Sequence, residues 1–269
     1  MYRICLFFKL IVLLTALSSC ELIDIHPYAG KLTGTLDINN KNIAAIESNF
    51  ASKDTIRFAF ISDSQRWYDE LGDFVEHINP KDDIDFIIHG GDLADFGLTD
   101  EFLMQRDLLE KSTKPYVVLI GNHDLLANGE EIFEKVFGSP NFSFIAGKTK
   151  FLGMNTNALE SNYANPVPNF SFINSELKNE QAPYNQTIAM MHARPTSEQF
   201  DNNVSNVFQY HIRQFPNLLF GLHGHEHRYM KEDVFNDGIF YIGGPNIGKR
   251  QYLVFTISPG SFTHEIHSY

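Results

Sequence analysis

PYVVLIGNHD, residues 115–124, is an apolar run rich in valine and isoleucine that passes directly into polar residues. A short apolar run that ends in glycine is typical of a buried β-strand. The polar residues that follow it, Asn122, His123 and Asp124, carry amide, imidazole and carboxylate groups, which are common metal ligands. The stretch therefore predicts a buried strand with metal-binding side chains at its carboxyl end.

Short apolar runs of the same kind recur along the chain, and helical patterns separate most of them. Buried strands that alternate with helices indicate an α/β layered fold. The other expected strands are IRFAFIS (56–62), IDFIIHG (84–90), TKFLGMN (149–155), TIAMMHA (187–193) and NLLFGLHG (217–224). The expected helices cover about residues 69–79, 99–112, 129–137, 170–180 and 203–214. Four apolar runs after residue 228 predict antiparallel strands that complete the sheets.

Polar residues follow almost every expected strand. Asp63 and Gln65 come after the first strand and Asp92 after the second, while His192 ends the fifth. The histidine-rich segment 223–227 ends the sixth. Ligands of open α/β sheets bind at the carboxyl ends of the strands, so these loops are expected to meet at one rim.

Two pairs of these residues are spaced two apart. Where a chain is extended, residues i and i+2 share a face, so Asp63 and Gln65 would point the same way, and so would His225 and His227. In an extended chain each pair can then share a metal ion.

Five blocks of the chain resemble, in order, the signature of the calcineurin-like metallophosphoesterase family. That signature runs D-x-H, GD, GNH[ED], His and GHxH. The blocks here are Asp63-Ser64-Gln65, Gly91-Asp92, Gly121-Asn122-His123-Asp124, His192 and Gly224-His225-Glu226-His227. The resemblance covers about residues 56–230 and implies a four-layer α/β/β/α sandwich that hydrolyses phosphate esters.

The resemblance also implies a dinuclear centre of divalent metal ions. Asp92 would bridge the ions, and a hydroxide between them would attack the phosphate. The charge of two such ions exceeds that of Asp63, Asp92 and the hydroxide, so the centre would attract an anionic substrate. The implied ligands are Asp63, Gln65, Asp92 and His227 for one ion, and Asp92, Asn122, His192 and His225 for the other.

Three residues outside this ligand set receive roles in catalysis or substrate binding. By resemblance, His123 would lie beside the phosphate and assist departure of the leaving oxygen, and Asp124 would orient the His123 ring. Arg194, two residues after His192, would either bind a substrate phosphate or form a surface ion pair.

Gln65 departs from the family signature, which has histidine at this position. An amide oxygen is a harder and weaker ligand than imidazole, so the position favours Mn²⁺, with iron or zinc as alternatives. The same Asp-x-Gln variant occurs in the manganese-dependent ADP-ribose/CDP-alcohol diphosphatase branch, which this sequence is similar to at that one position. The alternative is a degraded site with one occupied metal position.

Other polar residues have structural explanations. His89 lies inside an expected buried strand and His223 precedes the histidine pair, and we expect both to make hydrogen bonds around the site without binding metal. Residues 66–68, Arg-Trp-Tyr, form either a pocket wall or the start of a helix. GGPNIGKR, residues 243–250, has the P-loop spacing but lacks the Ser or Thr and precedes an expected strand, which excludes a nucleotide-binding loop.

Composition and charge further narrow the class of protein. The 269 residues are 43% apolar and 20% charged, as in one ordinary globular domain. With 21 basic and 33 acidic residues, the net charge of -12 has the wrong sign for bulk nucleic-acid binding. The two cysteines are Cys5 and Cys20, so no disulfide forms downstream.

The N-terminus, MYRICLFFKLIVLLTALSSC, combines basic residues with an apolar core that is short for a membrane span. Two serines before Cys20 resemble the lipobox of bacterial lipoproteins, which implies lipidation of Cys20 and membrane anchoring outside the cytoplasm, in the periplasm or at the cell surface. An ordinary cleaved signal or an uncleaved anchor are the alternatives. The expected organisation is a signal peptide (1–19), a spacer or edge segment (20–55) with one short helix, and a metallophosphoesterase domain (56–269).

The sequence thus predicts a hydrolase that acts on a phosphorylated small molecule or another phosphate ester. Monoesters, diesters and diphosphate esters all stay open, because the loops that select among them are not identified by the motifs. The alternative from another class is a catalytically silent metal-binding lipoprotein that acts as an interaction module.

Overall fold

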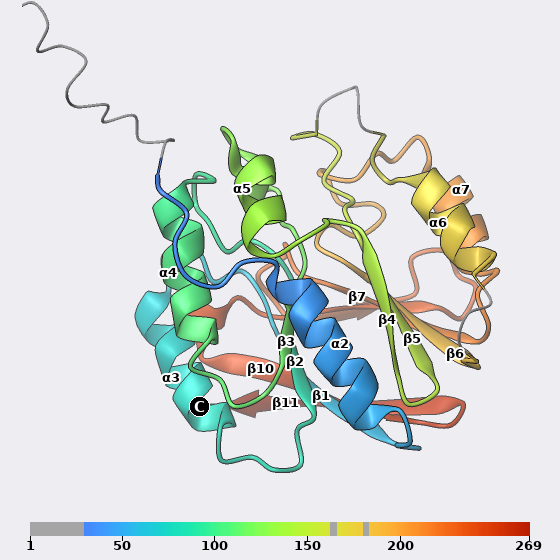
Figure 1. Ribbon diagram of the computed structural model, residues 1–269. Coiled ribbons are helices and arrows are strands. Elements are labelled where there is room, and N and C mark those ends of the chain that lie inside the picture. Colours follow the sequence, from blue (N-terminus) through green and yellow to red (C-terminus); the bar gives the residue numbers. More distant parts are fainter. Residues whose placement is uncertain (1–29, 162–165, 180–182) are drawn as a thin grey trace, which may run out of the picture.

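The computed structural model describes residues 30–161, 166–179 and 183–269 (Figure 1). In this part of the chain two β-sheets pack face to face, and helices cover their outer faces. The expected four-layer α/β/β/α fold is confirmed. The expected signal segment and Cys20 lie outside the described residues.

The first sheet has the strand order β11-β10-β1-β2-β3. Its strands β1, β2 and β3 run parallel, with β3 at the edge, while β10 pairs antiparallel with both β1 and β11. The strands are β1 (Ile56–Ile61), β2 (Phe86–His89), β3 (Tyr116–Val118), β10 (Gln251–Ser258) and β11 (Ser261–Ser268).

The second sheet has the order β4-β5-β6-β7-β9-β8, with parallel pairing from β5 to β9 and an antiparallel strand at each edge. Its strands are β4 (Phe142–Ala146), β5 (Thr149–Met154), β6 (Gln186–Met191), β7 (Leu218–His223), β8 (Met230–Glu232) and β9 (Phe240–Gly243). Strand β4 was not expected. It exists because a tight turn at Gly147 folds it back onto β5.

Alternating side chains of each strand enter different layers. On β1, Phe58 and Phe60 point between the sheets, whereas Ala59 and Ile61 face the helices. The Phe58 ring stacks on Phe255 at 5.1 Å and meets Phe151 of the second sheet edge-on at 5.5 Å. Strand residues buried on both faces explain why the sequence shows apolar runs instead of an apolar and polar alternation.

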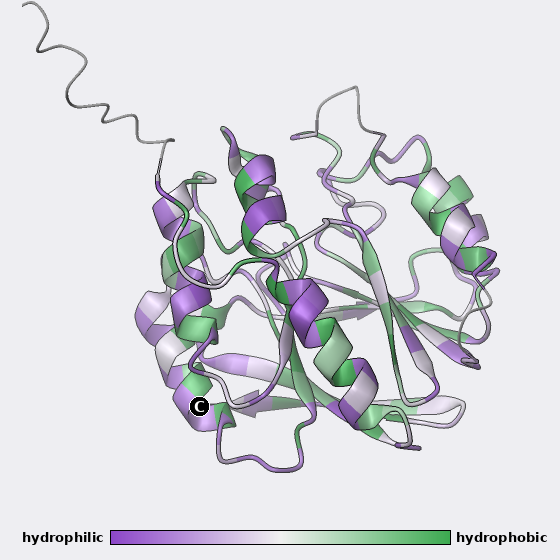
Figure 2. Cartoon of the chain, viewed as in Figure 1, coloured by the Kyte–Doolittle hydropathy of each residue, from purple (hydrophilic) through white to green (hydrophobic). Residues whose placement is uncertain are grey.

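Five helices cover the outer faces. Their residues alternate between hydrophobic and hydrophilic along the chain (Figure 2), as expected for helices that pack one side on a sheet. Helices α3 (Tyr68–Ile78), α4 (Thr99–Leu109) and α5 (Gly129–Val136) lie on the first sheet. Helices α6 (Phe170–Leu177) and α7 (Ser205–Ile212) lie on the second. Two short 3-10 helices, His123–Leu125 and Ile247–Lys249, complete the described elements.

Helix α2 (Ile38–Phe50) is longer than the short helix expected near residues 43–50, and it crosses the edge strands β3 and β4 (Figure 1). The Asn39 side chain donates to the Val118 carbonyl and accepts from the Val118 amide, both at 2.9 Å. These bonds give partners to the backbone amide and carbonyl of Val118, which the edge strand β3 would otherwise leave unpaired. Among the described residues, no helix has the length and apolar character needed to cross a membrane.

Candidate metal centre

The loops after β1, β2, β3, β6 and β7 meet at one edge of the molecule, where the carboxyl ends of both sheets converge. Backbone hydrogen bonds join these loops directly. The Asp63 amide donates to the Gly91 carbonyl at 3.0 Å, and the Gly224 amide donates to the His192 carbonyl at 3.1 Å. The predicted rim of polar residues is therefore one rigid constellation.

Asp63, Asp92 and His192 form the buried centre of this constellation. One ligand atom from each lies within 4.8 Å of the other two, and all three residues are at least 99% buried. Two carboxylates are rarely placed together out of water unless a cation compensates their charge.

The surrounding contacts divide into two groups. On one side, His227 Nε2 lies 3.3 Å from Asp63 Oδ1, and Gln65 Nε2 donates to Asp92 Oδ2 at 3.2 Å. On the other side, Asn122 Oδ1 lies 3.1 Å from both His192 Nε2 and His225 Nδ1.

Asp92 belongs to both groups. Its Oδ2 contacts Gln65 and also lies 3.3 Å from His192 Nε2. The structure thus brings all seven sequence-predicted ligands together. The two implied sets meet at the buried centre, where His192 Nε2 also lies 4.0 Å from Asp63 Oδ1.

Hydrogen bonds orient two of the histidines as ligands. His192 Nδ1 donates to the Gly90 carbonyl at 2.7 Å, which directs Nε2 toward Asp92 and Asn122. His225 Nε2 lies 2.9 Å from Glu198 Oε1, which directs Nδ1 toward Asn122. A partner on the outer nitrogen fixes the tautomer that a metal requires.

The donor set fits divalent ions. Gln65 is 7% exposed, and its Oε1 has no hydrogen-bond partner among the described residues, although its Nε2 is bonded to Asp92. A buried amide oxygen without a partner is costly unless something occupies its lone pairs. Oxygen ligands from Asp and Gln, together with imidazole nitrogen, suit manganese, iron or zinc.

The centre is electrostatically polarised. Burial opposes ionisation of Asp92, but His192 and His123 lower the pKa of this carboxyl to about 2. Burial likewise opposes protonation of His192, but Asp92 and Asp63 raise the pKa of its imidazole to about 10. Asp92 therefore stays ionised at neutral pH, and its negative charge faces the His192 imidazole.

The expected extended backbone is wrong at this rim. Left-handed conformations bring the ligands together instead, at Asp63 (φ 56°), Asp92 (58°), His225 (68°) and His227 (54°). Such residues cost of order 1–3 kcal/mol each and persist where the surroundings enforce them. As a result the two histidines contact different residues: His225 Nδ1 lies 3.1 Å from Asn122 Oδ1, and His227 Nε2 lies 3.3 Å from Asp63 Oδ1.

Two motif glycines permit the close approach of these loops. A Cβ on Gly121 would lie 2.1 Å from Asp92 Oδ1, and a Cβ on Gly91 would lie 2.7 Å from His192 Nδ1. Gly91 also has φ of 97°, a conformation that favours glycine.

His123 lies beside the ligands without joining them. Its backbone amide donates to Asp92 Oδ1 at 3.0 Å, and its side chain is 37% exposed. Nδ1 of the ring donates to the Asp95 carbonyl at 2.9 Å, with Asp95 Oδ1 at 3.8 Å. Asp95 therefore orients the ring and leaves Nε2 available.

The expected role of Asp124 in orienting His123 is not borne out by this geometry. Its carboxylate accepts the backbone amides of residues 92–94 and of Gly121, at 2.8 to 3.0 Å. Burial and the charge of Asp92 raise the pKa of Asp124 to about 7, although the amides favour its charged form. Asp124 positions the loop that carries Asp92, because its carboxylate accepts three consecutive backbone amides of that loop.

Arg194 forms ion pairs, which was the alternative expected for it, although it is buried instead of lying on the surface. Its Nε lies 3.4 Å from Glu226 and its Nη2 3.2 Å from Glu232, and the residue is 8% exposed. The two carboxylates neutralise the guanidinium, so the structure does not support Arg194 as a free phosphate ligand.

Several neighbours of the ligands complete the site. His89 bonds to Ser64 Oγ at 2.8 Å, and His223 bonds to the Gly224 carbonyl at 2.9 Å, so both act outside the ligand set as expected. Asp95 and Glu198 were missed by sequence reasoning. Asp95 lies three residues after Asp92 in GDLAD, a spacing that offered a signal, whereas Glu198 sits in a loop without a motif.

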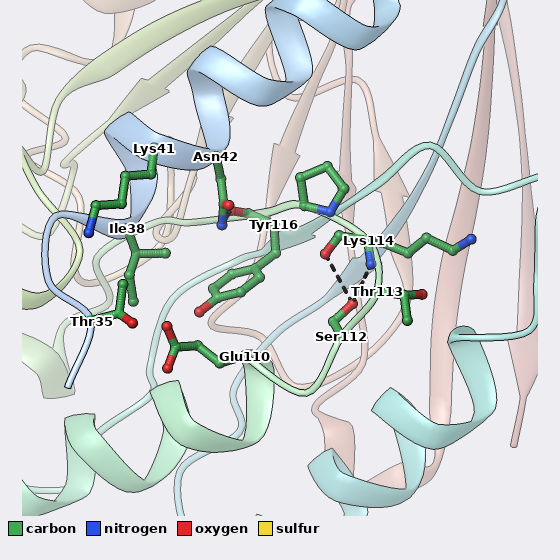
Figure 3. A pocket seen from close by; sticks show the side chains of 10 residues that line it. Thr35, Ile38, Lys41, Asn42, Glu110, Ser112, Thr113, Lys114 and Tyr116 are labelled. Carbon is green, nitrogen blue, oxygen red and sulfur yellow. Dashed lines mark hydrogen bonds between the residues drawn. The ribbon is translucent and has the colours of Figure 1, made fainter.

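A separate cavity of about 550 Å³ lies at the opposite end of β3, between α2 and the end of α4 (Figure 3). Its lining includes Lys41, Glu110 and Tyr116. Tyr116 begins β3 and Asn122 follows the end of that strand, so this cavity is distinct from the metal centre.

The fold and the ligand cluster together define a metal-dependent hydrolase of phosphate esters. The model of the calcineurin-like phosphoesterase family matches residues 56–229, and the chain belongs to this family. No curated protein sequence matches the chain.

Solved structures share the fold at low sequence identity. GAP50, described as the anchor in the inner membrane complex of Plasmodium, is 12% identical with a TM-score of 0.58, over 80% of this chain and 85% of that one. A 5'-nucleotidase from Candida albicans is 17% identical (TM-score 0.57, 82% and 52% covered). The purple acid phosphatase PPD1 from yellow lupin is 13% identical (TM-score 0.58, 81% and 52% covered). The chain spans about half the length of the last two.

The shared position of Asp92 predicts how metal content responds to substitution. Asp92→Asn removes a charge that faces both ligand groups, so the purified protein should lose metal from both after dialysis. His192→Ala removes a contact of one group and should retain about one equivalent. Metal analysis of both variants, with wild type alongside, measures this directly. Full retention in Asp92→Asn would rule out the bridging position.

Proposed function

We propose that this protein hydrolyses a phosphate mono-, di- or diphosphate ester at a dinuclear centre, and that it does so as a lipid-anchored protein outside the cytoplasm. The observation that supports the dinuclear centre is the pair of ligand groups that share Asp92. When bound, two divalent ions would stabilise charge on the phosphoryl oxygens and acidify water for in-line attack.

His123 is the residue proposed to assist the leaving oxygen. The carbonyl of Asp95 holds its Nδ1, and the amide of His123 is tied to a metal-ligand carboxylate. A protonated Nε2 on this partly exposed ring donates to an oxygen that departs from phosphorus. Asp124 contributes by holding the loop of Asp92 in place, not by contact with the ring.

Gln65 supports a preference for manganese over zinc, with iron as the other candidate. Its unpartnered Oε1 offers oxygen where the family signature has an imidazole nitrogen. The same Asp-x-Gln pattern is the one feature shared with the manganese-dependent ADP-ribose/CDP-alcohol diphosphatase branch, and this one position does not identify a substrate.

The second candidate is a catalytically silent metal-binding module. The fold alone is compatible with it, since GAP50 is described as an anchor. The ordered contacts of His123 with Asp95 and Asp92 favour the enzyme, because a module that only binds a partner needs no oriented imidazole beside its metals.

Substitution of His123 tests the catalytic role. His123→Ala should keep both metals and lower turnover about 10²- to 10⁴-fold, the usual contribution of a positioned acid. The loss should be larger for alkyl phosphates than for nitrophenyl phosphate, because nitrophenolate leaves without a proton. His267→Ala, on β11, serves as the control. Equal losses on both substrates would assign His123 to phosphate positioning, and metal loss would make it a ligand.

Gln65→His tests the metal preference. A nitrogen donor replaces an amide oxygen, so activity should shift toward Zn²⁺ and away from Mn²⁺ while the fold is retained. Activity across a series of metals, measured on dialysed wild type and variant, reports the shift. Superimposable profiles would show that residue 65 does not bind metal.

Cys20→Ser tests the anchor. One acyl chain binds a membrane only marginally, so stable attachment requires lipidation with more than one chain. The variant should be misprocessed or released from the membrane fraction, while purified residues 21–269 stay folded and active. Metabolic labelling with a palmitate analogue provides the readout, and an unlabelled wild-type protein would refute lipidation.

A further inference from the structure

The GGPNIGKR segment, residues 243–250, is not a P-loop, but it packs against the metal centre. A strand follows it instead of a helix, as the sequence predicts. Its Ile247 amide donates to the Ser62 carbonyl at 3.0 Å, and Asn246 forms a β-bridge with Ser62. Ser62 directly precedes Asp63, so the segment is fastened to a ligand-bearing loop.

Trp67 joins this segment to the first ligand loop. A Cβ on Gly248 would lie 2.6 Å from the Cε2 atom of the indole, so the ring lies directly against the glycine backbone. The Trp67 residue is nevertheless 39% exposed. It therefore forms a fixed aromatic wall that is open to solvent, two residues after Gln65.

Lys249 directly follows Gly248, the glycine that lies against the Trp67 indole. Its Nζ donates to the His227 carbonyl at 2.7 Å, which holds the ammonium group beside a metal-ligand histidine. Within the described ranges, Lys249 has no carboxylate at ion-pair distance. The next residue, Arg250, is different, because Asp73 binds it at 2.7 Å and Glu70 lies at 3.9 Å.

Arg66 directly precedes Trp67 in the chain. Its Nε and Nη2 each donate to the Asp95 carboxylate at 2.7 Å, which fixes the guanidinium plane. The side chain is 68% exposed, so its outer edge is open to solvent. Asp95 also holds His123, so this guanidinium lies beside the group proposed to face the leaving oxygen.

We propose that Lys249, beside Trp67, forms a subsite for a second anionic group of the substrate, since Arg66, like Arg250, is already paired with a carboxylate. The net charge of the chain is -12, which repels a polyanion. Specific binding of a polyanion therefore requires cations that the fold holds beside the binding site. The contact with the His227 carbonyl places Lys249 beside the centre that would hold the reacting phosphate. The inference rests on the proposed function and narrows its substrate class to phosphate esters with a second phosphate, that is, diphosphate esters.

Trp67 is the only tryptophan of the chain, so its fluorescence reports binding without turnover. The probes are methylenediphosphonate and methylphosphonate, titrated into the metal-loaded protein at constant free metal. Lys249→Met should weaken diphosphonate binding about 10-fold, the value of one charge-assisted contact, and change methylphosphonate binding less than about twofold. Lys249→Arg should restore most of the loss.

Arg250→Met is the matched control, because it removes one charge from the same segment at a residue already neutralised by carboxylates. It should leave both affinities unchanged. If Arg250→Met and Lys249→Met weaken both probes equally, the effect is general electrostatics and the subsite is refuted. An unchanged diphosphonate affinity in Lys249→Met also refutes it.

A kinetic arm separates this inference from the proposed function. Lys249→Met should raise KM for phenyl diphosphate about 10-fold and leave KM for phenyl phosphate within about twofold. Wild-type protein that hydrolyses neither ester would overturn the proposed function itself. Wild-type protein that hydrolyses both, with the same KM ratio in Lys249→Met, would overturn only the anion subsite.

Discussion

The structure depends on placing two carboxylates, Asp63 and Asp92, out of water next to one another and to His192. Burial of like charges is unfavourable, and the surrounding chain is arranged to offset it. Backbone amides bind both carboxylates, and His192 lowers the pKa of Asp92. Divalent ions would compensate the remaining negative charge of the two carboxylates. Metal binding therefore depends on the local backbone geometry that holds these carboxylates together.

The rest of the fold supplies the rigidity that this arrangement requires. Left-handed residues such as Asp63 and His225 stay in place because their loops are hydrogen-bonded to neighbouring loops from both sheets. The phenylalanine-rich layer around Phe58 fixes the spacing between the sheets, and that spacing sets the distance between the loops of β1 and β7. A well-packed interior resists small displacements, so the ligand distances are maintained.

The residues that hold the metal ligands and the residues proposed to contact the substrate lie at different depths in the site, in a buried layer and an outer layer. Buried groups hold the ligands and set their tautomers, while His123, Arg66 and Lys249 lie further out, where a substrate arrives. Asp95 connects two residues of the outer layer, because it contacts both the His123 imidazole and the Arg66 guanidinium. Substitutions in the outer layer can therefore change substrate choice without disturbing the buried carboxylates.

The sequence by itself determined the layered fold and the ligand set, because apolar runs and the polar residues that end them are local patterns. The family signature places Asp92 between two ligand sets, and in the structure Asp92 contacts both Gln65 and His192. The sequence did not reveal β4, Glu198 or the contact of Lys249 with His227, since each depends on residues far apart in the chain. It also misassigned Asp124, whose partners are backbone amides that only the folded loop presents. Which atoms face one another was decided by tertiary structure, because left-handed turns and packing between sheets reorient side chains that a linear pattern treats as extended.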